Sequence, residues 1–121
     1  MYEERVGVEI TNEQGVAIVA LRATSISNPA GIESVSEQIN KFIEAGCPNK
    51  MVIDFSGVKF FSSGVLGVLL DIRTRLKKYN GEVVISAIEP QLHRVFKITN
   101  LDKIFRFFPD RETAVKIVNA D

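Results

Sequence analysis

The chain has 121 residues, of which 45% are hydrophobic and 25% charged, a size and composition typical of one soluble globular domain. Fifteen basic residues balance fifteen acidic ones, so no net field attracts nucleic acid or an anionic membrane. The acidic start MYEERVGVEI does not resemble a signal peptide, and no apolar run approaches the roughly 20 residues of a membrane span. We therefore expect one cytoplasmic domain over residues 1–121, without membrane insertion or bound nucleic acid.

The first part of the chain predicts a β-hairpin followed by a helix. Apolar and polar residues alternate over residues 5–10, residues 12–15 are typical of a turn, and residues 16–21 are apolar and β-branched. The Ser-Asn-Pro sequence at 27–29 combines a capping residue with a proline in the first turn. Helical spacing of apolar residues then continues to residue 46.

The rest of the chain alternates between short apolar runs and helical patterns, which indicates helices packed on a mixed sheet. We expect strands over residues 51–55, 83–88 and 104–108, and helices over residues 64–79, 90–99 and 110–118. The residues expected to face inward are Val65, Leu66, Leu69, Ile72 and Leu76 on the helix over 64–79, and Ala114, Val115 and Val118 on the last helix. The fold class is therefore α/β, a small mixed sheet of about five strands with about four helices.

The stretch DFSGVKFFSSGVLG, residues 54–67, carries the functional information. It comprises a strand end, a short loop and a helix that opens on Ser62 and Ser63. Serine is a favoured N-cap because its hydroxyl can accept a hydrogen bond from an unpaired backbone N–H. Gly64 lets another backbone approach closely. The residues alone leave two alternatives open, a simple helix cap and a regulatory serine.

The remaining chemistry-bearing residues predict no enzyme, cofactor or metal site. His93 is the only histidine, so a histidine-rich metal site is excluded, and its mid-helix position favours a surface or half-packed side chain. Cys47, the only cysteine, cannot form an intramolecular disulfide. With no adjoining histidine or basic cluster, it is expected to be a small filler. The glycines of residues 57–67 match neither phosphate-loop nor dinucleotide-binding spacing.

Residues 54–67 resemble the signature of the STAS domain family, in which a strand ending in D-x-S-G-V leads through an apolar pair to a serine at a helix start. The matching positions are Asp54, Ser56, Gly57, Val58, Phe60, Ser63, Leu66 and Gly67. A second stretch, ITNLDKIFRFFPDRETAV at residues 98–115, is similar to the family's closing strand and helix. The resemblance implies the anti-sigma factor antagonist-like fold, with helices packed mainly on one side of the sheet.

The resemblance also implies a function, that of an anti-sigma factor antagonist. In such antagonists the serine that opens the central helix is phosphorylated by an anti-sigma factor that is also a serine kinase. Ser63 falls on this position, and Ser62 is the second choice. The expected partner is that anti-sigma factor, bound while Ser63 is unphosphorylated, and the chain itself is expected to be a monomer or weak homodimer. The expected contact residues are Val58, Lys59, Phe61, Ser62, Ser63, Gly64, Gly67 and Ser27.

Several alternatives stay open. Many antagonists have Gly-x-Leu-Asp after the second strand, whereas this chain has LRATSIS, in which Ser27 is the nearest polar substitute. This departure also fits a scaffold subunit of a stressosome-like or transporter complex, or a module that binds a small molecule or nucleotide. Alternation places Phe60 and Phe61 on opposite sides without deciding which is exposed. The basic stretch 73–78 is expected to be a solvated helix face, which could join the partner surface.

Overall fold

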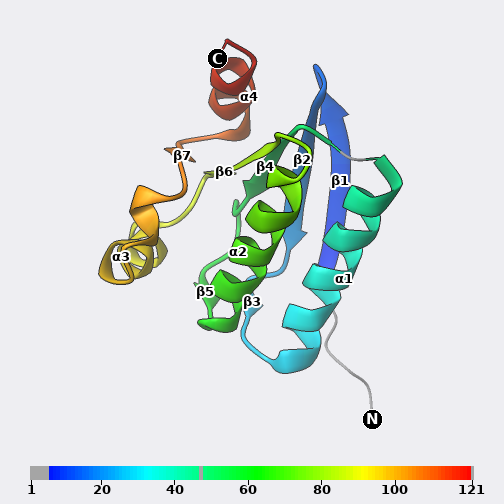
Figure 1. The fold of residues 1–121 in the computed structure, drawn as a ribbon. Helices are drawn as coiled ribbons and strands as arrows, with labels where there is room; N and C mark the ends of the chain where they lie inside the picture. The colour runs from blue at the N-terminus through cyan, green and yellow to red at the C-terminus, as the bar shows by residue number, and fades with distance from the viewer. Residues whose placement is uncertain (1–5, 47, 121) are drawn as a thin grey trace.

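The computed structural model describes residues 6–46 and 48–120, so Cys47 lies outside the described residues. The main sheet is mixed, because β1 and β2 form an antiparallel hairpin and the other three strands run parallel to β2 (Figure 1). In spatial order its strands are β1 (Gly7–Glu13), β2 (Val16–Arg22), β4 (Lys50–Asp54), β6 (Glu82–Ser86) and β7 (Phe107–Phe108).

The described residues form four α-helices that cover the two faces of this sheet unequally. They are α1 (Pro29–Gly46), α2 (Gly64–Lys77), α3 (Pro90–Ile98) and α4 (Arg111–Ala120). The first three pack into one large apolar cluster, whereas α4 packs into a smaller one on the opposite face. Successive side chains of β2 point to opposite faces of the sheet, so this strand contributes Val19 to the large cluster and Ile18 to the small one. The predicted fold class is confirmed.

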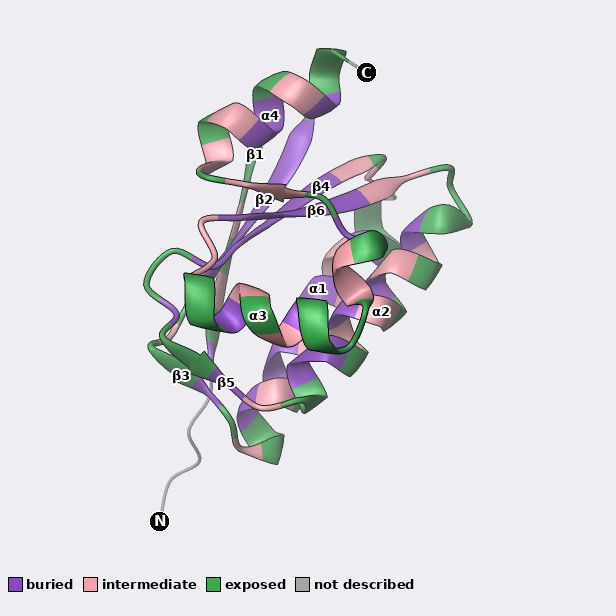
Figure 2. Ribbon diagram, turned by 90° about the vertical axis from the view of Figure 1, so that its left-hand side faces the viewer, coloured by how far each residue is buried: buried purple, intermediate pink, exposed green. Residues whose placement is uncertain are grey.

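The apolar faces of the helices are those that the spacing predicts. On α2, the five residues expected to face inward are all buried: Val65, Leu66, Leu69, Ile72 and Leu76. Figure 2 shows these buried segments on the side of α1 and α2 that faces the sheet. In the Ser-Asn-Pro sequence that precedes and opens α1, Asn28 supplies the cap, since its Oδ1 accepts a hydrogen bond from the Gly31 backbone N–H at 2.7 Å. Across the described chain, no helix has the length and hydropathy to cross a membrane.

The β1–β2 turn is tighter than the sequence predicts. The predicted turn covers residues 12–15, but strand pairing continues to Glu13 and leaves a two-residue loop of Gln14 and Gly15. Both loop residues have positive φ, 53° and 83°, which matches the right-handed twist of the paired strands. The Asn12 side chain stabilises the turn by accepting a hydrogen bond from the Gly15 N–H at 3.2 Å.

Two short strands have no counterpart in the sequence prediction. These are β3 (Ser25–Ile26) and β5 (Phe60–Phe61), which pair in parallel as a small separate sheet. The strand predicted over 104–108 is also shorter than expected, since a 3₁₀ turn, η1 (Leu101–Lys103), precedes it and only Phe107–Phe108 pair with β6. Two-residue strands are too short to show an alternating pattern, so only tertiary contacts reveal them.

Candidate functional site

Ser63 lies exposed at the N-terminus of α2, immediately before the first helical residue. It occupies the N-cap position with a helical backbone, φ −60° and ψ −19°, and its hydroxyl makes no capping hydrogen bond within the described chain. A serine that caps a helix normally has an extended backbone, which aims its oxygen at the free N–H groups. The Ser63 hydroxyl therefore does not cap this helix, and it is accessible from solvent.

The backbone around the serine pair is held in place by the β3–β5 pair. The Ser62 N–H donates to the Ile26 carbonyl at 3.1 Å, and the N–H groups of Lys59 and Phe60 both donate to the Thr24 carbonyl, at 2.7 and 3.2 Å. The serine carbonyls then accept the first hydrogen bonds of the helix. Ser63 is thus presented from a hydrogen-bonded framework and not from a free loop.

The structure brings Ser27 to the same end of the β3–β5 pair as the two serines. The parallel register pairs Ile26 with Phe61, so Ser27 and Ser62 are the next residues along the two strands. Ser27 is exposed, and its hydroxyl lies 3.4 Å from that of Ser25. This placement is compatible with a contact between Ser27 and a partner bound at Ser63, which stays a prediction.

Phe60 and Phe61 do point in opposite directions, and the structure decides which one is buried. Phe61 is only 7% exposed, and its ring packs edge-on against Phe55 and Phe96, with ring centroids 5.9 and 6.1 Å apart. Phe60 is 56% exposed. The expected surface contact by Phe61 is therefore wrong, because the ring is part of the core. Phe60 is the aromatic side chain available to a partner.

Val58 also departs from the predicted contact surface. Its side chain is fully buried in the large apolar cluster. The chain leaves β4 through a tight turn at Ser56 and Gly57, in which Gly57 has a φ of 89° and the Val58 N–H donates to the Phe55 carbonyl at 2.9 Å. This turn directs Val58 back into the core, so the predicted partner contact by Val58 is wrong.

Lys59, which stands between Val58 and Phe60 in the sequence, lies on the surface. Its ammonium group forms an ion pair with Glu89, the residue that precedes α3, at 2.6 Å. The hydrogen bond and the charge of Lys59 lower the pKa of the Glu89 carboxyl below its ordinary value. The Lys59 side chain is still 61% exposed, so it can meet a partner, although Glu89 already offsets its charge.

The two glycines of the predicted surface have different local environments. A Cβ on Gly64 would lie 2.9 Å from the Cδ1 atom of Ile32, so the absence of a side chain helps α1 approach α2. A Cβ on Gly67 would meet no described atom within 4 Å. Glycine inside a helix is destabilising by roughly 0.5–1 kcal/mol relative to alanine. No described contact accounts for glycine at Gly67, which lies one turn after Ser63 on the same face of α2.

Asp54, the first residue of the matched stretch, has a structural role that its sequence position does not reveal. The carboxylate is 3% exposed and accepts hydrogen bonds from the Ser86 hydroxyl at 3.0 Å and the Arg111 guanidinium at 2.6 Å. Arg111 is the first residue of α4. Asp54 therefore links the end of β4 to β6 and to the helix on the opposite face of the sheet.

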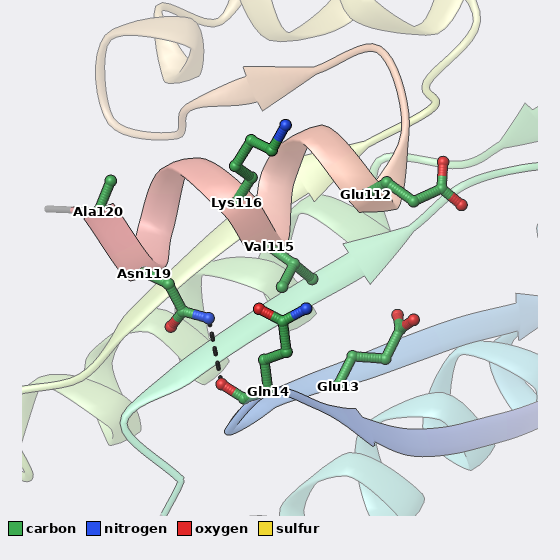
Figure 3. A pocket seen from close by; sticks show the side chains of 7 residues that line it. All are labelled: Glu13, Gln14, Glu112, Val115, Lys116, Asn119 and Ala120. Carbon is green, nitrogen blue, oxygen red and sulfur yellow. Dashed lines mark hydrogen bonds between the residues drawn. The ribbon is translucent and has the colours of Figure 1, made fainter.

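The described residues contain no cluster of histidine, cysteine and carboxylate side chains that could hold a metal ion. His93 is half-buried, with its ring centroid 4.2 Å from that of Phe107. A hollow of about 430 Å³ lies between α4 and the β1–β2 turn, where the Asn119 amide donates to the Gln14 carbonyl at 3.1 Å (Figure 3). Figure 1 shows α4 at the opposite end of the molecule from the start of α2.

Comparison with known proteins gives a consistent result. The family model of the STAS domain matches residues 8–114. The anti-sigma F factor antagonist of Paenibacillus polymyxa is 23% identical over 108 residues, 89% of this chain and 91% of that protein. The crystal structure of an anti-sigma factor antagonist from Mycobacterium paratuberculosis is similar with a TM-score of 0.82 and 26% identity, covering 94% of each chain. The phosphorylated form of the Bacillus cell fate determinant SpoIIAA has the same fold, with a TM-score of 0.70 and 19% identity over 93% of this chain and 99% of that one.

Proposed function

Because the chain belongs to the STAS domain family, we propose that it is an anti-sigma factor antagonist, which binds an anti-sigma factor while Ser63 is unphosphorylated. The observation that carries the proposal is the exposed Ser63 hydroxyl, which opens α2 without capping it. Two of the similar proteins are named as antagonists of this kind. The phosphorylated structure of SpoIIAA supports covalent regulation within the same fold.

The position of Ser63 allows a phosphate to alter binding without unfolding the domain. A phosphoryl group adds about −1.5 to −2 charges and three strong acceptors. The dipole at a helix N-terminus favours an anion, and the first turn of α2 contains no acidic residue that would repel it. A partner surface fitted to a neutral hydroxyl would instead face a dianion. Phosphorylation is therefore expected to release the partner.

The proposed partner surface consists of exposed or partly exposed residues on both sides of Ser63. The Phe60 ring provides apolar area, as the aromatic anchors of protein interfaces do. Gly67 leaves the α2 backbone uncovered on the face that Ser63 shares. Lys59, Ser62, Gly64 and Ser27 complete the surface. Val58 and Phe61 are excluded because both side chains are in the core.

Substitution of Gly67 separates its cost to the fold from its role in binding. Gly67→Ala is expected to raise the free energy of unfolding by roughly 0.5–1 kcal/mol, because alanine is the better helix former and its Cβ meets no described atom. Gly67→Leu is expected to weaken anti-sigma factor binding by about tenfold or more, since a branched side chain would cover the open backbone. Urea denaturation and isothermal titration calorimetry measure the two effects. Unchanged affinity in Gly67→Leu would place Gly67 outside the interface.

The proposal is tested by incubating the purified chain with its cognate anti-sigma factor, with and without ATP. We expect a complex on size-exclusion chromatography without ATP, and its dissociation as phosphate is incorporated. Tandem mass spectrometry should locate the phosphate at Ser63 in the wild type and in Ser62→Ala, and find none in Ser63→Ala. Phosphate on Ser62 in Ser63→Ala would show that Ser62, and not Ser63 alone, is a phosphorylation site. Absence of a complex under either condition would contradict the antagonist function.

A further inference from the structure

A second hollow lies at the far end of α2 from Ser63. Its volume is about 260 Å³, and it is bounded by the last turns of α2, the beginning of β6 and the residue that follows η1. Figure 1 shows α2 running from the β3–β5 pair to this end, where the chain turns into β6. The residues that line the hollow are Arg73, Lys77, Gly81, Glu82, Val83 and Ile104.

The hollow contains two cationic side chains without an anionic partner. Arg73 and Lys77 are four residues apart on α2, so they share one face of the helix. No ion pair of either one exists within the described chain. Glu82 also lines the hollow, but its carboxylate already pairs with Arg106 at 3.1 Å. The hollow therefore has a surplus of positive charge.

The neighbouring Arg75 shows that such pairing is available on this helix. Its guanidinium binds Asp71, one turn earlier, at 2.9 Å, and Asp71 together with the more distant Glu44 raises the Arg75 pKa. Arg73 and Lys77 line the hollow and form no such ion pair within the described chain. Their position near the C-terminus of α2 is electrostatically favourable, because the helix dipole is negative there.

Part of the lining of the hollow is apolar. Ile104 is 40% exposed, one of the few large hydrophobic side chains on the described surface, and it lines the hollow together with the buried Val83. Ile104 therefore adds an exposed apolar side chain to a hollow that is also lined by Arg73 and Lys77. The cationic and the apolar lining residues together match a ligand that carries both an anionic head and a short hydrocarbon body.

We propose that this hollow binds a small organic oxyanion, a carboxylate or a phosphate monoester with a short alkyl group. The planar guanidinium of Arg73 can bind two oxygens of such a head, and the ammonium of Lys77 adds a compact charge. Ile104 covers the alkyl group. The proposal concerns the end of α2 opposite Ser63, and it does not depend on the proposed antagonist function.

Titration of the ¹⁵N-labelled chain by NMR tests the proposal, with butyrate, butyl phosphate and inorganic phosphate at matched ionic strength and with 1-butanol as the uncharged probe. We expect saturable shifts of the Val83 and Ile104 amides with at least one of the two butyl anions, and none with 1-butanol. Arg73→Gln and Lys77→Gln should each weaken that binding by roughly tenfold. Ile104→Ala should weaken the binding of the butyl anion and leave the binding of inorganic phosphate unchanged.

Lys78→Gln is the matched control, since Lys78 is an exposed cation next to Lys77 that does not line the hollow. The affinity of Lys78→Gln for the butyl anion should equal that of the wild type. The proposal is overturned if neither butyl anion saturates the shifts. It is also overturned if Arg73→Gln and Lys77→Gln bind as tightly as the wild type, or if Lys78→Gln loses as much affinity as they do. The last result would show diffuse attraction to a basic helix end.

Discussion

Ser63→Asp is expected to lower the affinity for the anti-sigma factor by about 100-fold or more, which corresponds to about 2.7 kcal/mol of binding free energy. A carboxylate at this position would be desolvated against a surface fitted to a hydroxyl, and an unpaired interfacial charge costs several kcal/mol. The fold should tolerate the substitution, because an acidic group at a helix N-terminus is favourable. We expect the free energy of unfolding to stay within about 0.5 kcal/mol of wild type.

Two variants control for this effect in the same titration experiment. Ser63→Ala removes the hydroxyl without adding charge and should bind within about threefold of wild type, since little interface area is lost. Gln14→Asp places the same charge on the exposed β1–β2 turn, at the other end of the molecule from Ser63 (Figure 1), and should also bind normally. If Ser63→Asp binds as tightly as these controls, a charge at Ser63 does not switch partner binding.

The adjacent residues Phe60 and Phe61 are expected to give opposite results on substitution by alanine. Phe61→Ala should lower the free energy of unfolding by about 3–5 kcal/mol, because it empties a ring-sized space between Phe55 and Phe96. Whole domains of this kind are stable by only about 5–15 kcal/mol, so the variant will be close to unfolding. Urea denaturation followed by far-UV circular dichroism measures the loss.

Phe60→Ala should change the free energy of unfolding by no more than about 0.5 kcal/mol, since more than half of its side chain already faces solvent. It should weaken anti-sigma factor binding by about tenfold, the effect of removing an aromatic anchor. A larger loss of stability in Phe60→Ala than in Phe61→Ala would contradict the placement of Phe61 in the core and Phe60 on the surface. Normal binding by a stable Phe60→Ala would remove Phe60 from the partner surface.

The regular elements could be predicted because their signals are local and repetitive. The spacing of apolar residues located α2 and its inward side, and the same reasoning placed Ala114, Val115 and Val118 on the buried side of α4. The β3–β5 pair could not be predicted in this way. Its strands are 35 residues apart in sequence and two residues long, so neither periodicity nor turn chemistry marks them.

The candidate site was predictable to a similar extent. The location of Ser63 follows from the strand, loop and helix start that surround it in the sequence. The burial of Val58 and Phe61 does not, because it depends on core residues such as Phe96 from a different helix. The bond between Asp54 and Arg111 joins residues 57 positions apart. No local pattern identifies Arg111 as the residue that neutralises this buried carboxylate.

The hydrogen bonds from Lys59, Phe60 and Ser62 to the β3 segment also affect how the surface meets a partner. A loop that must become ordered on binding loses conformational entropy at that moment, and this loss is subtracted from the affinity. Here the backbone before Ser63 is already fixed when the domain has folded. In the proposed complex, this domain contributes a surface that is already ordered, and the proposed modification of Ser63 changes that surface without reorganising the chain that presents it.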